Sequence, residues 1–490
     1  MSVLLLFKLS SILLATTSGK WRYAILFFDC IFVVGAYFSI DLPSSLQVEF
    51  VLDEQMRCHA NESMITSSCC NICLGLGSRR YNLFHALLYW TSSVLSLFSG
   101  WAIDRIGNRV SAVLFIILTS LGCNLFAIAG SPLLRNTSIM FPLMLFGRML
   151  LGFGNGPLRI VQDRVVSHWF AGDSFVPLSF ITLTRRGGAL LNFLTTANIS
   201  VHFSFTWSLW VGAIICSSGI VAALVMGFLD FHGTKQLDAE SKIRLASRAI
   251  KISDITNIPK TFWIHVAMIT FHSGTFVVFV ANGSEYIQLR YGYSKVFASY
   301  VTGATYIGPV FLGPFVALLL KKIDCNGLVA MTITTFCIPV YLLLAYCPAI
   351  PPVILTVIIG VVYSFDVIIM WKVTIDMLPQ AVFGTAAGIA MFAMRLIIGL
   401  MNLAVGSIIE STREHYRQED IYAYQNALLL MTATSIMSVL CGILLNILDI
   451  RNGDGVNKRF VKIKPVEISD TTELVGNDNL NKQYSRNIEN

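Results

Sequence analysis

Charged residues are scarce in this chain of 490 amino acids, where Lys, Arg, Asp and Glu together make up only 13%. Ordinary soluble domains carry about a quarter, and here apolar residues reach 55%, so the composition excludes that class. The net charge of +7 is modest, and no basic stripe is interleaved with aromatic residues. Nucleic-acid binding is therefore not expected, and the charge instead suits the cytosolic flanks of membrane helices.

Motifs of common enzyme and ATPase chemistry are also missing. The sequence has no Walker A loop, no Rossmann fingerprint, no H-E-x-x-H and no G-x-S-x-G in a plausible setting. ATP-driven pumping and membrane hydrolysis thus have no support. We expect the protein not to be an enzyme and to have no cofactor and no metal.

Long apolar runs are what the sequence has in abundance. A membrane helix needs ~20 mostly apolar residues, and about twelve stretches satisfy this length. They predict an all-α membrane protein with twelve transmembrane helices in two six-helix halves. The expected spans are residues 21–40, 81–101, 110–129, 140–161, 175–196, 206–229, 262–281, 296–320, 329–347, 353–375, 385–409 and 424–448.

The polar segments divide the chain into five parts. The first is a short N-terminal segment, for which a signal peptide is the less favoured alternative, and the third holds an expected amphipathic helix at 239–250. The C-terminal tail is polar and is expected to be disordered in the cytosol. The five parts are the N-terminal segment 1–20, the first half 21–229, the central loop 230–261, the second half 262–448 and the tail 449–490.

A charged segment at 100–109 joins the second and third expected spans. It reads G-x-x-x-D-R-x-G-x-R, and its members are Gly100, Asp104, Arg105, Gly107 and Arg109. Its charges mark a water-facing edge, and its glycines allow a tight turn. The pattern resembles the signature between helices 2 and 3 of the major facilitator superfamily. We therefore expect a gating role centred on Asp104, whereas the second-half counterpart has Lys321 in the acidic position.

Four glycosylation sequons follow odd-numbered spans, at Asn61, Asn136, Asn198 and Asn282. A glycan acceptor must face the lumen, and an excess of Lys and Arg marks the cytosolic side. The two signals fall on opposite sides of the expected membrane. Both termini are accordingly expected in the cytosol.

Four of the eleven cysteines crowd the polar loop after the first span: Cys58, Cys69, Cys70 and Cys73. This crowding predicts one or two disulfides in an oxidising lumen, with the connectivity open. A zinc site is the alternative, but no second cysteine pair stands at a familiar spacing.

The fourth span carries two arginines among glycines. At 3.6 residues per turn, Arg148, Gly152, Gly156 and Arg159 share one helix face. The Arg148-x-x-x-Gly152 pattern resembles the fourth-helix signature of the same superfamily. Both arginines are candidates for substrate binding, and the alternative for each is an anchor that extends to the membrane surface.

Arg185 and Arg186 lie in the middle of the fifth span, ~16 Å from its start. At that depth an arginine is costly in lipid and is expected to face a cavity or a partner. We expect one of the two to face a ligand and the other to meet Asp29, at similar depth in the first span, which makes Asp29 a further candidate for the substrate site. The alternative is that Asp29 is protonated or locally hydrated.

The second half offers a matching pair of buried charges. Asp366 and Arg395 are at about equal depth in spans 10 and 11, and we expect them to form an ion pair. A structural role is favoured over a proton-coupled switch. His85, His265 and His272 are either titrating groups or hydrogen-bonded packing residues.

A narrower resemblance covers most of the membrane part. Segments 37–47, 146–162, 169–170, 363–371 and 383–388 resemble the lysosomal dipeptide transporters of the major facilitator superfamily. The resemblance implies a uniport-type or proton-influenced carrier of small peptides or amino-acid-like solutes, in which Arg185 binds a substrate carboxylate and Trp371 lines the cavity. It also implies a glycosylated accessory subunit. Gly156 departs from the pattern, since the family has an acidic residue there, and Arg159 adds positive charge one turn further on.

These observations predict a carrier that moves a small solute by rocking of its two halves around a midplane site. A dipeptide or amino-acid-like solute is expected first, in the lysosomal membrane, because segment 470–475 resembles an acidic dileucine-type sorting signal. The expected partners are the small-molecule substrate and membrane lipid. A plasma-membrane carrier of organic anions, sugars or nucleobases and a non-transporting membrane sensor remain as alternatives.

Overall fold

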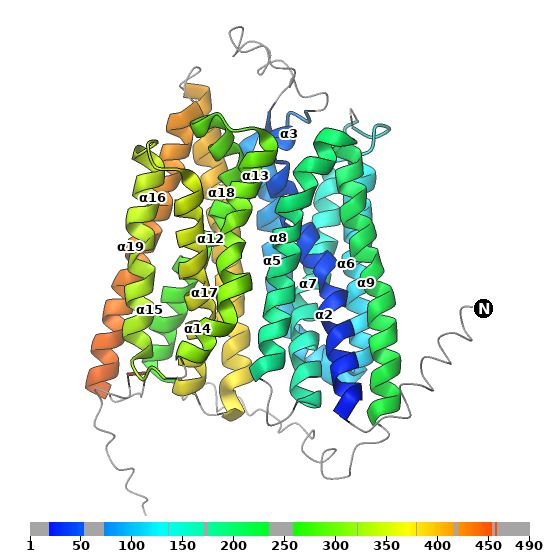
Figure 1. Cartoon of the computed structure of the whole chain (residues 1–490), viewed down its shortest axis with the longest axis vertical. Coiled ribbons are helices and arrows are strands. Elements are labelled where there is room, and N and C mark those ends of the chain that lie inside the picture. Colours follow the sequence, from blue (N-terminus) through cyan, green and yellow to red (C-terminus); the bar gives the residue numbers. More distant parts are fainter. Residues whose placement is uncertain are drawn as a thin grey trace, which may run out of the picture.

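The computed structural model describes residues 19–52, 73–135, 137–170, 175–234, 258–320, 322–378, 380–415, 420–452 and 456–457. Over these ranges the chain is helical, and its β structure is one isolated bridge between Cys325 and Asn457. The helices form two groups that stand side by side, with roughly parallel axes (Figure 1). The predicted all-α, two-half architecture is confirmed.

The first half contains six long helices and one short helix. The short helix α3 lies at one end of the bundle, which we call the α3 end (Figure 1). The elements are α2 (Gly19–Ser45), α3 (Gln47–Val51), α5 (Gly77–Ile106), α6 (Asn108–Ala129), α7 (Met140–Trp169), α8 (Phe175–His202) and α9 (Phe205–Thr234).

The second half repeats the pattern with two interrupted spans. One is broken at Pro309, whose missing N–H disturbs the helical ladder and accompanies a 3₁₀ and a π turn. The elements are α12 (Lys260–Tyr291), α13 (Lys295–Gly303), η1 (Ala304–Tyr306), η2 (Gly308–Leu312), α14 (Gly313–Leu320), α15 (Asn326–Thr335), α16 (Cys337–Tyr346), α17 (Pro352–Met377), α18 (Gln380–His415) and α19 (Asp420–Asn452).

Nine helical segments of the described chain are long and apolar enough to cross a membrane. Helices α5, α7 and α8 are comparable in length, at 30, 30 and 28 residues, but are more polar. If α13–α14 and α15–α16 each count as one span, each half has six membrane-length segments among the described residues. This arrangement is consistent with the predicted twelve spans.

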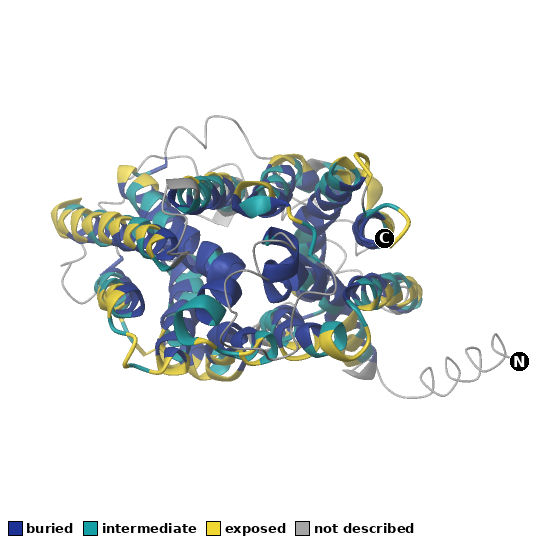
Figure 2. Ribbon diagram, turned by 90° about the horizontal axis from the view of Figure 1, so that it is seen from above, coloured by how far each residue is buried: buried dark blue, intermediate teal, exposed yellow. Residues whose placement is uncertain are grey.

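Large apolar side chains also cover the outside of the bundle. Phe98, Val110, Phe311 and Phe315 are all more than half exposed, as expected of residues that face lipid. Seen from above, buried residues line the inward faces of the helices and exposed residues the outer rim (Figure 2). Each half has its own apolar core, and at the α3 end Phe193 of α8 joins the core of the second half.

Two predicted boundaries are wrong. The first span is expected to end at residue 40, but α2 continues through Pro43 to Ser45. The polar tail was expected to begin at 449, but Asp449 is buried and accepts hydrogen bonds from the backbone N–H groups of Val456 and Asn457 at 3.0 and 2.9 Å. The expected amphipathic helix at 239–250 lies outside the described residues.

Candidate functional site

The candidate site lies between the two halves, where three arginines come from both sides of the interface: Arg159 and Arg186 from the first half and Arg395 from the second. Arg159 extends from α7, and its guanidinium carbon is 5.9 Å from the centroid of the Trp371 ring on α17. Its side chain makes no hydrogen bond or ion pair with any described residue, and its Nε is buried without a partner. Arg185 and Arg186 add positive potential at Arg159. The site therefore holds a partly buried cation whose hydrogen-bonding capacity is unused.

Arg186 contacts the second half through one tyrosine. Its Nη2 donates to the hydroxyl of Tyr363 on α17 at 2.6 Å, and its guanidinium lies 4.9 Å from the centre of that ring. Tyr363 is itself stacked on Phe276 of α12, with ring centroids 3.6 Å apart and planes within 2°. The stack fixes the tyrosine, and so the position of the arginine, without a carboxylate.

Arg395 completes the set from α18. Its Nη1 donates to the backbone oxygen of Ser92 at 3.0 Å, to the Ser92 hydroxyl at 2.7 Å and to the Ser96 hydroxyl on the same helix, α5. The expected Arg395–Asp366 ion pair is therefore wrong. The two residues share a depth but face different helices, because depth along a helix does not fix direction around it.

Gly156 of α7 allows α5 to pack closely against α7. A Cβ at this position would lie 2.6 Å from the backbone oxygen of Ser92 and 2.8 Å from the hydroxyls of Ser92 and Ser96. No acidic side chain fits where the resembling family carries one. The glycine instead lets α7 pack against the same serines that bind Arg395.

Arg185 is buried, at 6% exposure, and is fully engaged inside the first half. Its Nε donates to Gln162 Oε1 at 2.6 Å, and its Nη2 pairs with Asp163 at 2.6 Å. The predicted direct contact with Asp29 is not formed: neither carboxylate oxygen of Asp29 has a hydrogen-bond partner. The guanidinium of Arg185 thus holds α8 to α7 in this conformation, and its predicted role in binding a substrate carboxylate would require that guanidinium to be released.

Arg148 does not face the site, so the prediction that it binds substrate is wrong. Its Nη1 and Nη2 donate to the backbone oxygens of Ser39 and Ile40 on α2 at 3.0 and 2.9 Å, and the residue is 1% exposed. Pro43 has no N–H to offer the oxygen of Ser39 four residues earlier. Arg148 supplies the missing donor, which is why α2 can continue past the proline.

The motif at 100–109 forms the turn between α5 and α6, as predicted. Gly107 adopts a φ of 86°, which favours glycine. Arg109 pairs with Asp230 near the end of α9, and the indole of Trp169 at the end of α7 donates to the same carboxylate at 2.7 Å. Gly100 has open space around it and Arg105 is exposed, while the side chain of Asp104 lies outside the described residues. The described part of the motif therefore ties three helices of the first half together.

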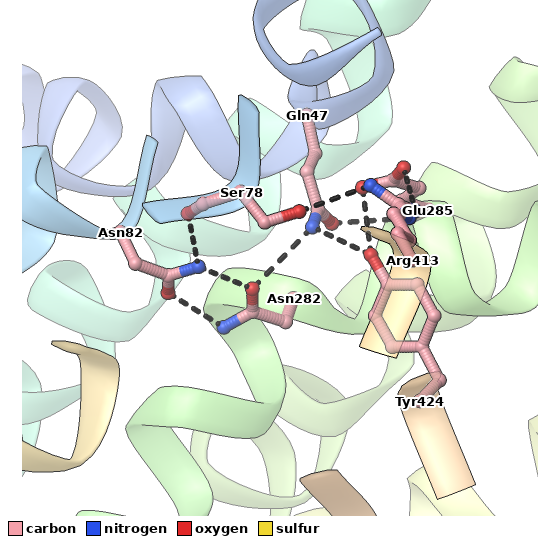
Figure 3. A network of polar contacts seen from close by, with 7 residues as sticks. All are labelled: Gln47, Ser78, Asn82, Asn282, Glu285, Arg413 and Tyr424. Carbon is pink, nitrogen blue, oxygen red and sulfur yellow. Dashed lines mark hydrogen bonds and ion pairs between the residues drawn. The ribbon is translucent and has the colours of Figure 1, made fainter. Parts of the chain in front are cut away.

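A buried polar network closes the α3 end between the halves, and it was not predicted (Figure 3). Asn82 of α5 and Asn282 of α12 exchange two amide hydrogen bonds, both at 3.0 Å. Gln47 of α3 donates to the Tyr424 hydroxyl of α19 at 3.1 Å. These four residues come from four helices, α3, α5, α12 and α19, and are separated by up to 377 positions in the sequence. No local sequence pattern therefore predicts the network.

An ion pair extends this network. Arg413 of α18 donates to Glu285 of α12 at 2.7 Å and to the Ser78 hydroxyl at 3.0 Å (Figure 3). The Tyr424 hydroxyl donates to the second oxygen of Glu285 at 2.6 Å. Nearby, Lys295 pairs with Glu49. The Glu285–Arg413 pair lies within the second half, while the Lys295–Glu49 ion pair and the Arg413–Ser78 hydrogen bond join the two halves at the α3 end, largely removed from water.

Two predicted glycan acceptors lie in helices rather than loops. Asn282 is inside α12 and 3% exposed, so its assignment as a luminal acceptor is wrong. Asn198 is inside α8 and donates to the Tyr300 hydroxyl at 2.6 Å. Asn61 and Asn136 are outside the described residues. In both described cases the three-residue sequon lies within a helix, where so short a pattern arises by chance.

The cysteine-rich loop is described only at its end. Cys73 is disulfide-bonded, as the crowding predicts for at least one pair. Cys58, Cys69, Cys70 and Lys321 lie outside the described residues. The seven cysteines in or beside helices are free thiols.

Comparison with known proteins identifies the family. A model described as Major Facilitator Superfamily matches residues 30–401. The chain is 24% identical over 449 residues to a Danio rerio protein named lysosomal dipeptide transporter MFSD1, covering 89% of each chain. It is also 24% identical to the Homo sapiens protein of that name, covering 80% of each.

Solved structures show the same fold. A D-xylose–proton symporter superposes with a TM-score of 0.61 at 14% identity, covering 85% of this chain and 97% of that one. An inward-facing, occupied bacterial homologue of the human lysosomal transporter Spinster gives 0.60 at 12% identity, covering 88% and 98%.

Proposed function

This chain belongs to the major facilitator superfamily and is a multi-pass membrane transporter of small solutes, and we propose that its substrate carries a carboxylate, with a dipeptide as the first candidate. The carboxylate would bind Arg159 between the halves. The printed names of the relatives support the dipeptide class. The geometry supports the carboxylate independently of those names.

The unpaired guanidinium of Arg159 carries this proposal. A charge in a buried setting is costly unless it is paired and hydrogen-bonded, and Arg159 has neither kind of partner among the described residues. A planar guanidinium binds a carboxylate through two parallel N–H···O bonds. Trp371 lies beside the guanidinium, with 5.9 Å between the guanidinium carbon and the ring centroid, and its indole has no oxygen to accept a hydrogen bond, so the N–H groups remain for the ligand.

A small organic anion is the second candidate. The site gathers Arg159, Arg186 and Arg395, and no described carboxylate pairs with any of the three. The closed packing at Gly156 leaves no acid there to bind an ammonium group. For a dipeptide, the ammonium would instead face the rings of Trp371 and Tyr363 beside the arginines, since aromatic rings attract cations. Discrimination between the two candidates thus depends on whether a free amino group contributes to binding.

Orientation follows from chemistry at the α3 end. The Cys73 disulfide requires an oxidising compartment, so we place the α3 end in the lumen and both termini in the cytosol. The names of the relatives support the lysosomal membrane. The Glu49–Lys295 ion pair and the Asn82–Asn282 hydrogen bonds join the halves at the luminal end, which supports access to the site from the cytosolic side in this conformation. A glycosylated accessory subunit remains a prediction from the family resemblance.

Transport is tested by counterflow in proteoliposomes. Vesicles loaded with unlabelled alanyl-alanine should accumulate the labelled dipeptide, and Arg159→Gln should abolish this exchange. Arg22→Gln is the matched control, because Arg22 is exposed on α2, away from the site, and should exchange at the wild-type rate. Absence of exchange of alanyl-alanine and of small organic acids by the wild type would refute the proposal, as would wild-type exchange by Arg159→Gln.

A further inference from the structure

A cavity opens on the outer face of the first half at the α3 end, distinct from the arginine site between the halves. Its volume is about 630 Å³, within the range of small-molecule sites. One wall is the segment between α6 and α7, which contributes Pro132 and Arg135, and the other is the beginning of α9 with Ser204 just before it. Helices α6 and α9 pack side by side at the edge of this half (Figure 1). The cavity therefore lies where the spans end, not on the route between the halves.

Arg135 supplies the charge of this cavity, and much of its hydrogen-bonding capacity is unused. Its Nη2 donates to the hydroxyl of Thr206, another lining residue, at 3.0 Å, and its guanidinium carbon lies 5.9 Å from the centre of the Phe205 ring. These two contacts fix the direction of the side chain. Its Nε is buried without a hydrogen-bond partner. A partly buried guanidinium held in this way is suited to bind an anion.

No acidic residue balances the charge of Arg135. The sequence has no Asp or Glu from 105 to 162 or from 174 to 229, so neither wall of the cavity contains a carboxylate. The other lining residues are neutral, and no described carboxylate forms an ion pair with Arg135. The cavity accordingly carries one uncompensated positive charge, and a ligand with one negative charge complements it.

The remaining wall of the cavity has the character of a membrane interface. Trp207 and Trp210 line it from the first turns of α9, and tryptophan favours this depth because its ring is apolar and its indole N–H is polar. Trp207, Ile214 and Val221 follow one another at seven-residue intervals, near one face of the helix, and all three are more than half exposed. From Trp207 to Val221 the helix rises ~21 Å, and the hydrocarbon core is ~30 Å thick. An apolar stripe thus runs from the charged cavity past the middle of the membrane.

We infer that this cavity binds the headgroup of an anionic phospholipid, with its phosphate on Arg135 and its acyl chains along α9. A guanidinium binds phosphate oxygens through parallel N–H···O bonds, and basic pockets between membrane helices bind such headgroups. The exposed stripe favours a lipid over a free phosphate, because only a lipid has chains to cover it. A choline headgroup would bring a second cation close to Arg135, which opposes binding. The inference is independent of the proposed function, and no transport measurement enters its test.

The test compares lipids with the same chains in thermal unfolding of the purified protein in detergent. Dioleoyl phosphatidylglycerol should raise the Tm of the wild type, dioleoyl phosphatidylcholine should need about fivefold more lipid for the same shift, and glycerol phosphate should give no shift. Arg135→Gln should respond equally to the two lipids. Arg80→Gln is the matched control, because Arg80 is exposed at the same end, beside the Phe141 ring and outside the cavity, and should keep the wild-type preference.

A second measurement locates the lipid on the wild type and needs no variant. Phosphatidylglycerol with a diazirine in one acyl chain should crosslink to residues 207–221 of α9, and excess unlabelled lipid should compete. Equal Tm shifts by the two lipids in the wild type would overturn the inference, as would a preference that persists in Arg135→Gln or is also lost in Arg80→Gln. A shift by glycerol phosphate as large as that by phosphatidylglycerol would assign the cavity to a soluble anion instead. Crosslinks confined to other helices would contradict the placement on α9.

Discussion

Arg159 on α7 and Trp371 on α17 meet across the midline of the molecule, with 5.9 Å between the guanidinium carbon and the centre of the indole. This contact joins the fourth span of one half to the fourth span of the other. It places the guanidinium beside an aromatic ring, and the side chain of Arg159 has no hydrogen-bond or ion-pair partner among the described residues. A site that opens and closes by relative movement of the halves would make and break this contact in each cycle.

The geometry of this contact depends on the planar guanidinium rather than on charge alone. Arg159→Lys keeps the charge but loses the paired donors of the planar guanidinium. We expect KM for alanyl-alanine counterflow to rise about tenfold, the equivalent of ~1.4 kcal/mol. Trp371→Phe, which keeps a weaker aromatic face, should raise KM less. Equal KM values for the wild type and Arg159→Lys would show that two-point recognition is not used.

Arg148 is expected to be structural, through the carbonyl that Pro43 leaves free. Arg148→Met removes two charge-assisted hydrogen bonds from a buried setting, which should cost about 3 kcal/mol or more and lower the Tm in detergent. Pro43→Ala restores an N–H for Ser39, so the double variant should lose less than the sum of the single effects. Strict additivity in the thermal unfolding of the four proteins would contradict this account.

Close packing at Gly156 predicts a steric effect. Gly156→Ala places a methyl group 2.6 Å from the Ser92 backbone oxygen, so α5 and α7 must separate, at about 1–3 kcal/mol. The separation also displaces the serines that bind Arg395. Gly313→Ala is the control, because no atom lies within 4 Å of its added methyl group. A Tm for Gly156→Ala equal to that of the control would argue against the tight contact.

Burial of Asn282 predicts that it carries no glycan. The mass removed by glycosidase treatment should be the same for the wild type and Asn282→Gln, because the acceptor lies inside α12 and bonds to Asn82. Gel mobility before and after the enzyme measures this. A glycan-sized reduction specific to Asn282→Gln would place residue 282 in a luminal loop and contradict the fold.

The fold was predictable from apolar runs because membrane burial imposes a length that the sequence displays directly. For the site, the sequence predicted some of the residues but not how they contact one another. Arg159 was predictable because a charge in a span is rare, whereas Trp371 was expected only through the family resemblance. Their contact across 212 positions was not predicted, since helix periodicity says nothing about which helices meet.

The wrong predictions concern contacts between helices, which the sequence of a single helix does not determine. Asp366 and Arg395 were paired by depth, yet each helix also has a rotation, and that is set by packing. The prediction that Arg148 binds substrate failed for a second reason. Its partner is a backbone oxygen that Pro43 leaves without a donor, and a backbone oxygen has no signature in the sequence. His272 and Asp366 are each recognisable in the sequence as polar residues within a span, but only the packing of α12 against α17 brings them together.

Recognition of a carboxylate by Arg159 is tested most directly by comparing alanyl-alanine with its C-terminal amide as ligands in thermal unfolding of the purified protein. A ligand that binds only the folded state raises the Tm by an amount that grows with the logarithm of the ratio of its concentration to its Kd. The free acid should stabilise the wild type, the amide should need at least tenfold higher concentration for the same shift, and Arg159→Gln should respond equally weakly to both. If the amide stabilises the wild type as well as the acid does, then Arg159 does not bind the substrate carboxylate.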